Sequence, residues 1–214
     1  ELAPNFLRFM KQIDLPDCSE NYPENLHIVT VHNYPEKSLF EQSLDLLNIP
    51  TKRVTVLKPT EPWSYTLKVL YFQDFLRRNK EDLDLVLFCD ASDVIIKKKP
   101  QKIIDVFSSY SCDALFMSTG SPVGYALMPD IYNWQLKTFG NRFLNSGVFI
   151  GRAAFLLEII DECSRYCGDK PITKNEFQAL GAAKPGDDRV ARLLPNFPMN
   201  ALDQDIFRYV HPKF

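Results

Sequence analysis

Two carboxylates follow an apolar run in the stretch LVLFCDASDVII, at residues 85–96. Asp90 comes directly after the run, and Asp93 lies three residues further on. At a separation of ~4 Å and an effective dielectric of ~20, two such charges repel each other by about 4 kcal/mol. A shared proton, a basic partner, full solvent exposure or a divalent cation can offset that repulsion. Oxygen ligands suit hard ions, so we follow the hypothesis of a Mn²⁺ or Mg²⁺ site, against a turn capped by Asp93 with a solvated Asp90.

Two further segments place polar residues beside apolar ones. FLNSGVFIG (143–151) sets Asn145, Ser146 and Gly147 just before a predicted buried strand, where small residues let a ligand approach the backbone. ALDQDIFRYV (201–210) sets two acids and a glutamine at the start of a predicted helix. Each segment alone also has a structural explanation, namely a turn into a strand and acidic residues at a helix N-terminus.

Strand and helix patterns alternate along the chain. They predict strands at 26–31, 51–57, 83–90, 113–118 and 145–151, and helices at 38–47, 64–79, 102–110, 152–167 and 202–210. The segments 119–142 and 168–200 are predicted to be irregular. This alternation predicts an α/β domain with a mainly parallel sheet. Ligands of such sheets bind beyond the carboxyl ends of the strands, which is where the two acids after residue 89 fall.

Net charge, apolar runs and cysteine spacing limit the classes of partner and site that this chain can have. The 214 residues carry a net charge of -2, which argues against a nucleic-acid backbone as the main partner. No run approaches the ~18 consecutive apolar residues of a membrane span. The five cysteines form no CxxC pattern and support neither a zinc site nor a complete disulfide framework. We expect residues 1–25 to be an extension packed on a single domain at 26–214.

The order of the three polar segments resembles that of a nucleotide-sugar glycosyltransferase of the GT-A type, in particular the glycosyltransferase domain of the procollagen lysyl hydroxylase family. That family has an acid pair with two residues between, an LNSG-x-FIG segment and an acidic run ending in D-Q. The matching residues here are Asp90-Ala91-Ser92-Asp93, Leu144 to Gly151, and Asp203-Gln204. Glycogenin-like and bacterial galactosyltransferases are similar at NSGVF, but one residue separates their acids. The resemblance spans residues 26–209 and implies a Rossmann-like GT-A fold with helices on both faces of the sheet.

The resemblance implies an enzyme that moves a hexose from a UDP-sugar to a hydroxyl of a protein or glycan acceptor, collagen among them. The residues leave the compartment open, and the resemblance points to the secretory pathway or the lumen of the endoplasmic reticulum. Mn²⁺, with Mg²⁺ as the alternative, would be held by Asp90 and Asp93, and His211 is the candidate for the family's third ligand. Donor binding would fall to Thr30, His32, Asn33, Lys68, Asp90, Ala91, Ser92, Asn145 and Gly147. Asn145, Gly147, Asp203 and Gln204 would line the sugar and acceptor side. Asp203 or Asp205 would stabilise an oxocarbenium-like sugar, which makes Asp203, Gln204 and Asp205 the candidate catalytic residues.

The chain departs from the family's pattern around Gln204. The acidic run before it is here Ala201-Leu202-Asp203, and Asp205 is an additional acid. Three other functions stay open: a GT-A-fold domain that binds a nucleotide or partner without turnover, a haloacid-dehalogenase-like phosphatase, and a structural α/β module. The phosphatase chemistry needs its two acids separated by one residue, whereas two residues separate Asp90 from Asp93.

Overall fold

The computed structural model describes residues 15–20, 22–122, 125–168, 197–199 and 202–214. The chain splits into two compact units. The first unit takes the described residues of Glu1–Glu61, Leu76–Leu115 and Gly147–Leu156. The second unit takes those of Pro62–Phe75, Phe116–Ser146 and Leu157–Phe214. Most of the predicted amino-terminal extension, residues 1–14 and 21, and most of the segment 168–200 lie outside the described residues.

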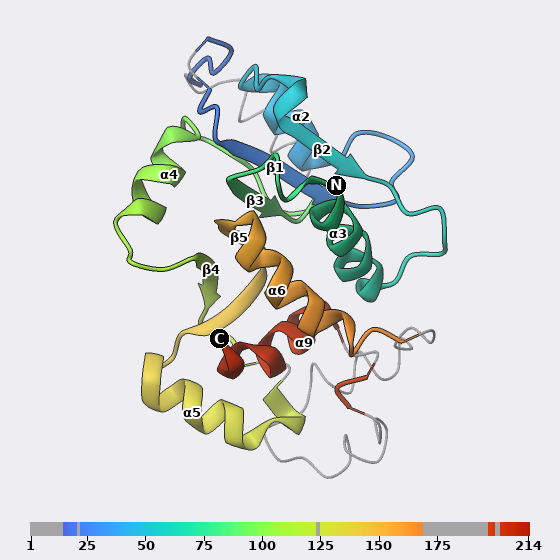
Figure 1. The fold of residues 1–214 in the computed structure, drawn as a ribbon, viewed down its shortest axis with the longest axis vertical. Coiled ribbons are helices and arrows are strands. Elements are labelled where there is room, and N and C mark those ends of the chain that lie inside the picture. The colour runs from blue at the N-terminus through green and yellow to red at the C-terminus, as the bar shows by residue number, and fades with distance from the viewer. Residues whose placement is uncertain (1–14, 21, 123–124, 169–196, 200–201) are drawn as a thin grey trace. The chain divides into compact units, whose positions relative to one another are not determined.

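A five-stranded sheet and six α-helices make up the regular structure of the described residues, together with short 3₁₀ turns (Figure 1). The strands are β1 (Leu26–Val31), β2 (Val54–Leu57), β3 (Leu85–Cys89), β4 (Ala114–Thr119) and β5 (Phe143–Arg152). The helices are α2 (Leu39–Leu46), α3 (Tyr65–Asn79), α4 (Gln101–Ser108), α5 (Pro129–Phe139), α6 (Ala153–Ser164) and α9 (Asp203–Val210). The predicted α/β fold class is confirmed.

The strands lie in the order β2-β1-β3-β5-β4. Strand β1 runs parallel to both of its neighbours, with Ile28 opposite Val54 of β2 and Leu87 of β3. Strand β5 runs antiparallel to β3 and places Val148 opposite Cys89. Because the carboxyl ends of parallel strands meet at one edge of a sheet, the residues that follow β1 and β3 emerge on the same side.

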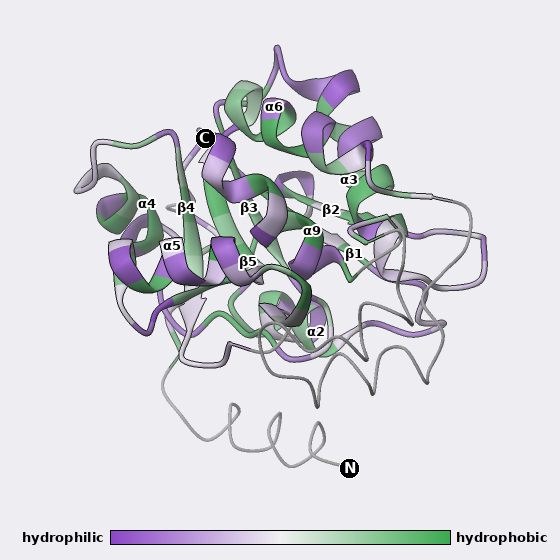
Figure 2. Cartoon of the chain, turned by 90° about the horizontal axis from the view of Figure 1, so that it is seen from below, coloured by the Kyte–Doolittle hydropathy of each residue, from purple (hydrophilic) through white to green (hydrophobic). Residues whose placement is uncertain are grey.

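Strand β3 is buried along its whole length. Its sequence LVLFC is apolar at every position, as expected for a strand covered on both faces, and Figure 2 draws it in the hydrophobic colour. Leu87 and Cys89 join Phe40 and Leu44 of α2 in one core cluster. This packing fixes the end of β3, from which the two acids of the DxxD motif continue.

Two predictions about the second half of the chain need correction. The segment 119–142, predicted to be irregular, contains the eleven-residue helix α5. Pro129 stands at its first turn and Gly140, with φ 63°, ends it, so these residues are helix boundaries rather than signs of a loop. Strand β5 begins at Phe143, two residues before its predicted start, so Asn145 to Gly147 lie well inside the strand rather than at its beginning.

Gly151 of β5 is packed so closely that a larger residue must displace backbone. A Cβ added there would lie 2.8 Å from the Asp113 carbonyl oxygen and 3.0 Å from atoms of Ala114 and Leu156. We expect Gly151→Ala to lower the free energy of unfolding by roughly 1–3 kcal/mol, as overpacking does. Urea denaturation would measure it. Gly120→Ala is the matched control, since no atom lies within 4 Å of its added Cβ, and equal stability of the two variants would contradict the expectation.

Candidate functional site

Asp90 and Asp93 lie directly beyond the carboxyl end of β3, in the first unit. The backbone N–H of Asp90 donates to the carbonyl oxygen of Gly147 on β5 at 2.7 Å. Ala91, between the two acids, is buried, and its carbonyl accepts from the N–H of Phe40 at the start of α2 at 3.2 Å. The backbone of the DxxD turn is therefore held from two sides, by β5 and by α2.

The side chains of this turn fit a hard divalent cation. Asp90 is half-buried and Asp93 is exposed, with the Ser92 hydroxyl donating to Asp93 Oδ1 at 3.4 Å. Mg²⁺ and Mn²⁺ prefer oxygen ligands, and such ions often bind through one or two carboxylates together with water and substrate phosphates. Over the residues that the structure describes, no three His, Cys, Asp or Glu side chains gather into a larger metal-binding group.

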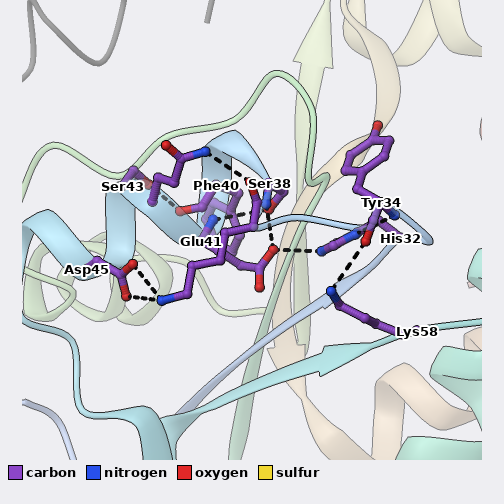
Figure 3. A network of polar contacts seen from close by, with 10 residues as sticks. His32, Tyr34, Ser38, Phe40, Glu41, Ser43, Asp45 and Lys58 are labelled. Carbon is purple, nitrogen blue, oxygen red and sulfur yellow. Dashed lines mark hydrogen bonds and ion pairs between the residues drawn. The ribbon is translucent and has the colours of Figure 1, made fainter. Parts of the chain in front are cut away.

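His32, immediately after β1, is buried and held through both ring nitrogens (Figure 3). Its Nδ1 lies 3.1 Å from the backbone nitrogen of Tyr34, and its Nε2 lies 2.7 Å from Glu41 Oε2. Because a backbone N–H can only donate, Nδ1 accepts and carries no proton. The ring proton is therefore on Nε2, which donates to the carboxylate of Glu41. This contact fixes both the orientation and the tautomer of the imidazole.

Glu41 connects His32 to the first turn of α2. Its Oε2 also accepts from the N–H of Ser38 at 2.7 Å, and its own N–H donates to Ser38 Oγ at 3.2 Å, which completes a capping box. Burial raises the pKa of Glu41, but the hydrogen bonds from Ser38 and His32 outweigh it and the net shift is downward. The carboxylate therefore stays ionised and holds the imidazole.

Tyr34 presents an aromatic ring beside His32, and it is not among the predicted site residues. The two rings stack with centroids 4.9 Å apart and an interplanar angle of 26°. The backbone N–H of Tyr34 is bound to His32, and its carbonyl accepts from Lys58 Nζ at 3.3 Å (Figure 3). Tyr34 nevertheless remains 43% exposed. A flat apolar surface is thus held in a fixed orientation at the strand end.

Thr30 in β1 and Asn33 just beyond it, both predicted to bind the donor, differ in solvent exposure. Thr30 is fully buried, and its hydroxyl oxygen has no hydrogen-bond partner. Asn33, directly after His32, is exposed. The first unit therefore brings most of the predicted donor-binding residues to the ends of β1 and β3: Thr30, His32, Asn33, Asp90, Ala91 and Ser92, with Gly147 bound to Asp90.

In the second unit, Asp203 is the centre of a buried polar group. The Ser146 hydroxyl of β5 donates to Asp203 Oδ2 at 2.6 Å, and the Lys68 ammonium of α3 forms an ion pair with the same oxygen. All three side chains are buried. A buried carboxylate is tolerated when a cation and a hydrogen-bond donor compensate its charge, as here. Lys68, predicted to bind the donor, is thus paired with Asp203 in this structure.

Asp205 lies two residues further along α9 and is 1% exposed. Its Oδ1 is 4.0 Å from an Arg208 nitrogen, whereas its Oδ2 is buried without a hydrogen-bond partner. Burial raises the pKa of Asp205 to about 7, with Arg208 lowering it and Asp203 raising it further. Gln204, between the two acids, is half-buried.

His211 follows α9 and packs on α5. Its ring meets Trp134 edge-on, with centroids 5.3 Å apart, and stacks on Phe139 at 5.8 Å. Its Nδ1 is buried without a partner, and burial lowers the pKa of the imidazole. Asn145, a predicted donor-binding residue, is half-buried in β5. The role of His211 as a metal ligand stays a prediction.

The family model described as the PLOD GT domain matches residues 24–169. This match covers more than half of the chain, including the DxxD turn and the NSGVFIG segment. The chain belongs to this family. It is therefore a glycosyltransferase domain of the procollagen lysyl hydroxylase type, and its mixed sheet and helices form the predicted Rossmann-like GT-A fold. No curated protein matches the chain.

The family match covers only part of the candidate site. The matched residues end before α9, so the acids of α9 and His211 lie outside the family match.

None of the helices in the described part of the chain combines the length and apolar composition that crossing a membrane requires.

Proposed function

We propose that this domain transfers a hexose from a UDP-sugar to a hydroxyl of a protein or glycan acceptor, with Mn²⁺ bound at Asp90 and Asp93. The observation that carries the proposal is the DxxD turn itself. It places two carboxylates beyond β3, the backbone of the first bound to Gly147, in a chain of a glycosyltransferase family. Bound there, the ion would neutralise negative charge on the leaving diphosphate. The family relationship makes a collagen-like chain the first acceptor to test.

The residues at the end of β1 are suited to the nucleoside of the donor. A uracil ring is flat and binds well against an aromatic side chain, because stacking needs only a π-face. Tyr34 offers such a ring, which stacks on His32, while Lys58 binds the backbone carbonyl of Tyr34. Asn33, exposed beside it, can donate and accept hydrogen bonds with the base or the ribose.

Asp203 is better suited than Asp205 to stabilise positive charge on the sugar. Its carboxylate is compensated by Lys68 and Ser146, so it can remain negative although buried. Asp205, with a pKa of about 7, exchanges its proton near neutral pH and does not keep a constant charge. A residue that stabilises an oxocarbenium-like transition state must be negative when that charge develops.

The test is a panel of UDP-sugars with Mn²⁺, in which UDP release is followed with and without a collagen-like peptide. Acceptor-dependent release from one UDP-hexose supports the proposal and names the donor. Saturable UDP binding with no release from any sugar would instead identify the domain as a nucleotide-binding module that lacks turnover. Absence of both binding and release would reject the donor class.

Tyr34→Ala is expected to weaken Mn²⁺-dependent UDP binding about 10-fold, since stacking of a base on an aromatic ring contributes ~1–3 kcal/mol. Tyr34→Phe keeps the ring and should bind UDP like the unmodified protein. Isothermal titration calorimetry would measure both. Tyr110→Ala, which removes another exposed tyrosine, is the control. Unchanged affinity in Tyr34→Ala would remove this ring from the donor site.

A further inference from the structure

Arg208 is the largest of the side chains that are completely buried in the described residues. It lies on α9, five residues after Asp203, and is 1% exposed. Guanidinium groups remain charged in proteins, and burying one is costly unless acceptors and a counter-charge surround it. The site described above leaves Arg208 with no role beyond its proximity to Asp205.

The guanidinium contacts three separate parts of the second unit. Its Nε donates to the carbonyl oxygen of Leu144 on β5 at 3.0 Å, and one terminal nitrogen donates to that of Ser121, after β4, at 3.4 Å. The other terminal nitrogen faces Asp205 Oδ1 at 4.0 Å. The guanidinium carbon lies 4.6 Å from the centroid of the Tyr125 ring. The side chain thus joins α9 to a strand, a connecting segment and an aromatic residue.

Helix α9 is consequently attached to β5 at two points. Asp203 accepts from Ser146, and Arg208 donates to Leu144. Leu144 and Ser146 are two residues apart, or about 7 Å along a strand. The two helix residues are five apart, or about 7.5 Å along the helix axis. Both contacts are present in this structure, one at the first residue of α9 and one in its last turn. Together with the buried side chains of Ile206, Phe207 and Val210, these two contacts hold the rotation and the axial position of α9.

We propose that Arg208 is a positioning residue that sets the rotation of α9 and thereby places the Asp203 carboxylate at Ser146. In this arrangement Asp205 Oδ1 faces the guanidinium of Arg208 at 4.0 Å. The proposal rests on the proposed function, in which Asp203 stabilises the sugar. In this orientation of α9, the side chains of both acids, Asp203 and Asp205, are buried.

Arg208→Lys is the informative variant because it keeps the charge and most of the volume. A lysine ammonium cannot reproduce the planar fork that reaches two carbonyl groups in fixed directions. We expect kcat to fall about 10–100-fold while KM for the donor stays within about 3-fold, as for an interaction that acts in the transition state. Arg165→Lys is the matched control, since Arg165 is an exposed arginine paired with Glu162 in the same unit.

A double-mutant cycle with Ser146→Ala separates positioning from general destabilisation. If Arg208 acts through the Asp203–Ser146 contact, Arg208→Lys should cost less than about 3-fold in kcat once Ser146 is already alanine. A full and independent loss in both backgrounds would overturn the proposal. So would an equal loss of kcat in the Arg165→Lys control.

A crystal structure of the Arg208→Lys variant decides the proposal without any activity. Ser146 Oγ and Asp203 Oδ2 should separate beyond hydrogen-bond range, about 3 Å for an O–H donor. If that contact persists, Arg208 does not position Asp203, whatever the kinetics. If the unmodified domain transfers no sugar, the proposed function fails, while this structure still tests the positioning.

Discussion

Replacing Asp90 by Asn is expected to weaken UDP binding in the presence of Mn²⁺ by at least about 100-fold, or about 2.7 kcal/mol. The substitution keeps the shape of the side chain and removes its charge, and neutral amide oxygens hold divalent cations less strongly than carboxylates do. The fold should remain intact because the Asp90 contact with Gly147 is made by the backbone N–H. The thermal midpoint of Asp90→Asn should therefore stay close to that of the unmodified domain.

Calorimetric titration of UDP with Mn²⁺, and again with a chelator, would measure this loss. The chelator should lower the affinity of the unmodified domain to that of the variant. Asp45→Asn is the matched control, since Asp45 is an exposed acid of the same unit whose charge is paired with Lys37. If Asp90→Asn bound UDP with Mn²⁺ as tightly as the control, the DxxD turn would not be the metal site.

The sequence predicts those parts of the fold that depend on the pattern of neighbouring residues. Strand β3 was predictable because its five residues are all apolar and all buried. Helix α5 was not predicted because Pro129 and Gly140 are also common in loops, although proline at the first turn and glycine after the last are typical helix boundaries. The antiparallel direction of β5 depends on how the chain returns to β3, which no local pattern records.

The candidate site was predictable as a set of residues but not as a set of contacts. The capping box of Ser38 and Glu41 has a local signature, S-x-x-E, yet its second role as a partner of His32 arises only when β1 and α2 pack. The contact of Arg208 with Leu144 joins residues 64 apart in the chain. Lys68 is similar: its sequence context suggests a surface lysine or a phosphate ligand, whereas the fold pairs it with Asp203.

Asp203→Asn should lower kcat on the order of 10²–10³-fold, the scale seen when one electrostatic contact to a transition state is removed. Donor affinity should change by less than about 3-fold, since the loss concerns the transition state alone. Stopped-flow measurement of UDP release together with calorimetric donor binding would separate the two quantities. Equal losses in both would show that Asp203 serves donor binding instead.

This variant also disturbs stability, which must be separated from catalysis. It leaves the buried Lys68 ammonium without the Asp203 counter-charge, and breaking a buried pair from one side costs about 3–5 kcal/mol. In the double variant Lys68→Met with Asp203→Asn, both charges are gone, and the thermal midpoint should recover toward that of the unmodified domain. Sugar transfer should not recover. If it did, the loss in Asp203→Asn would have come from the stranded charge, and Asp203 would have no direct part in the chemistry.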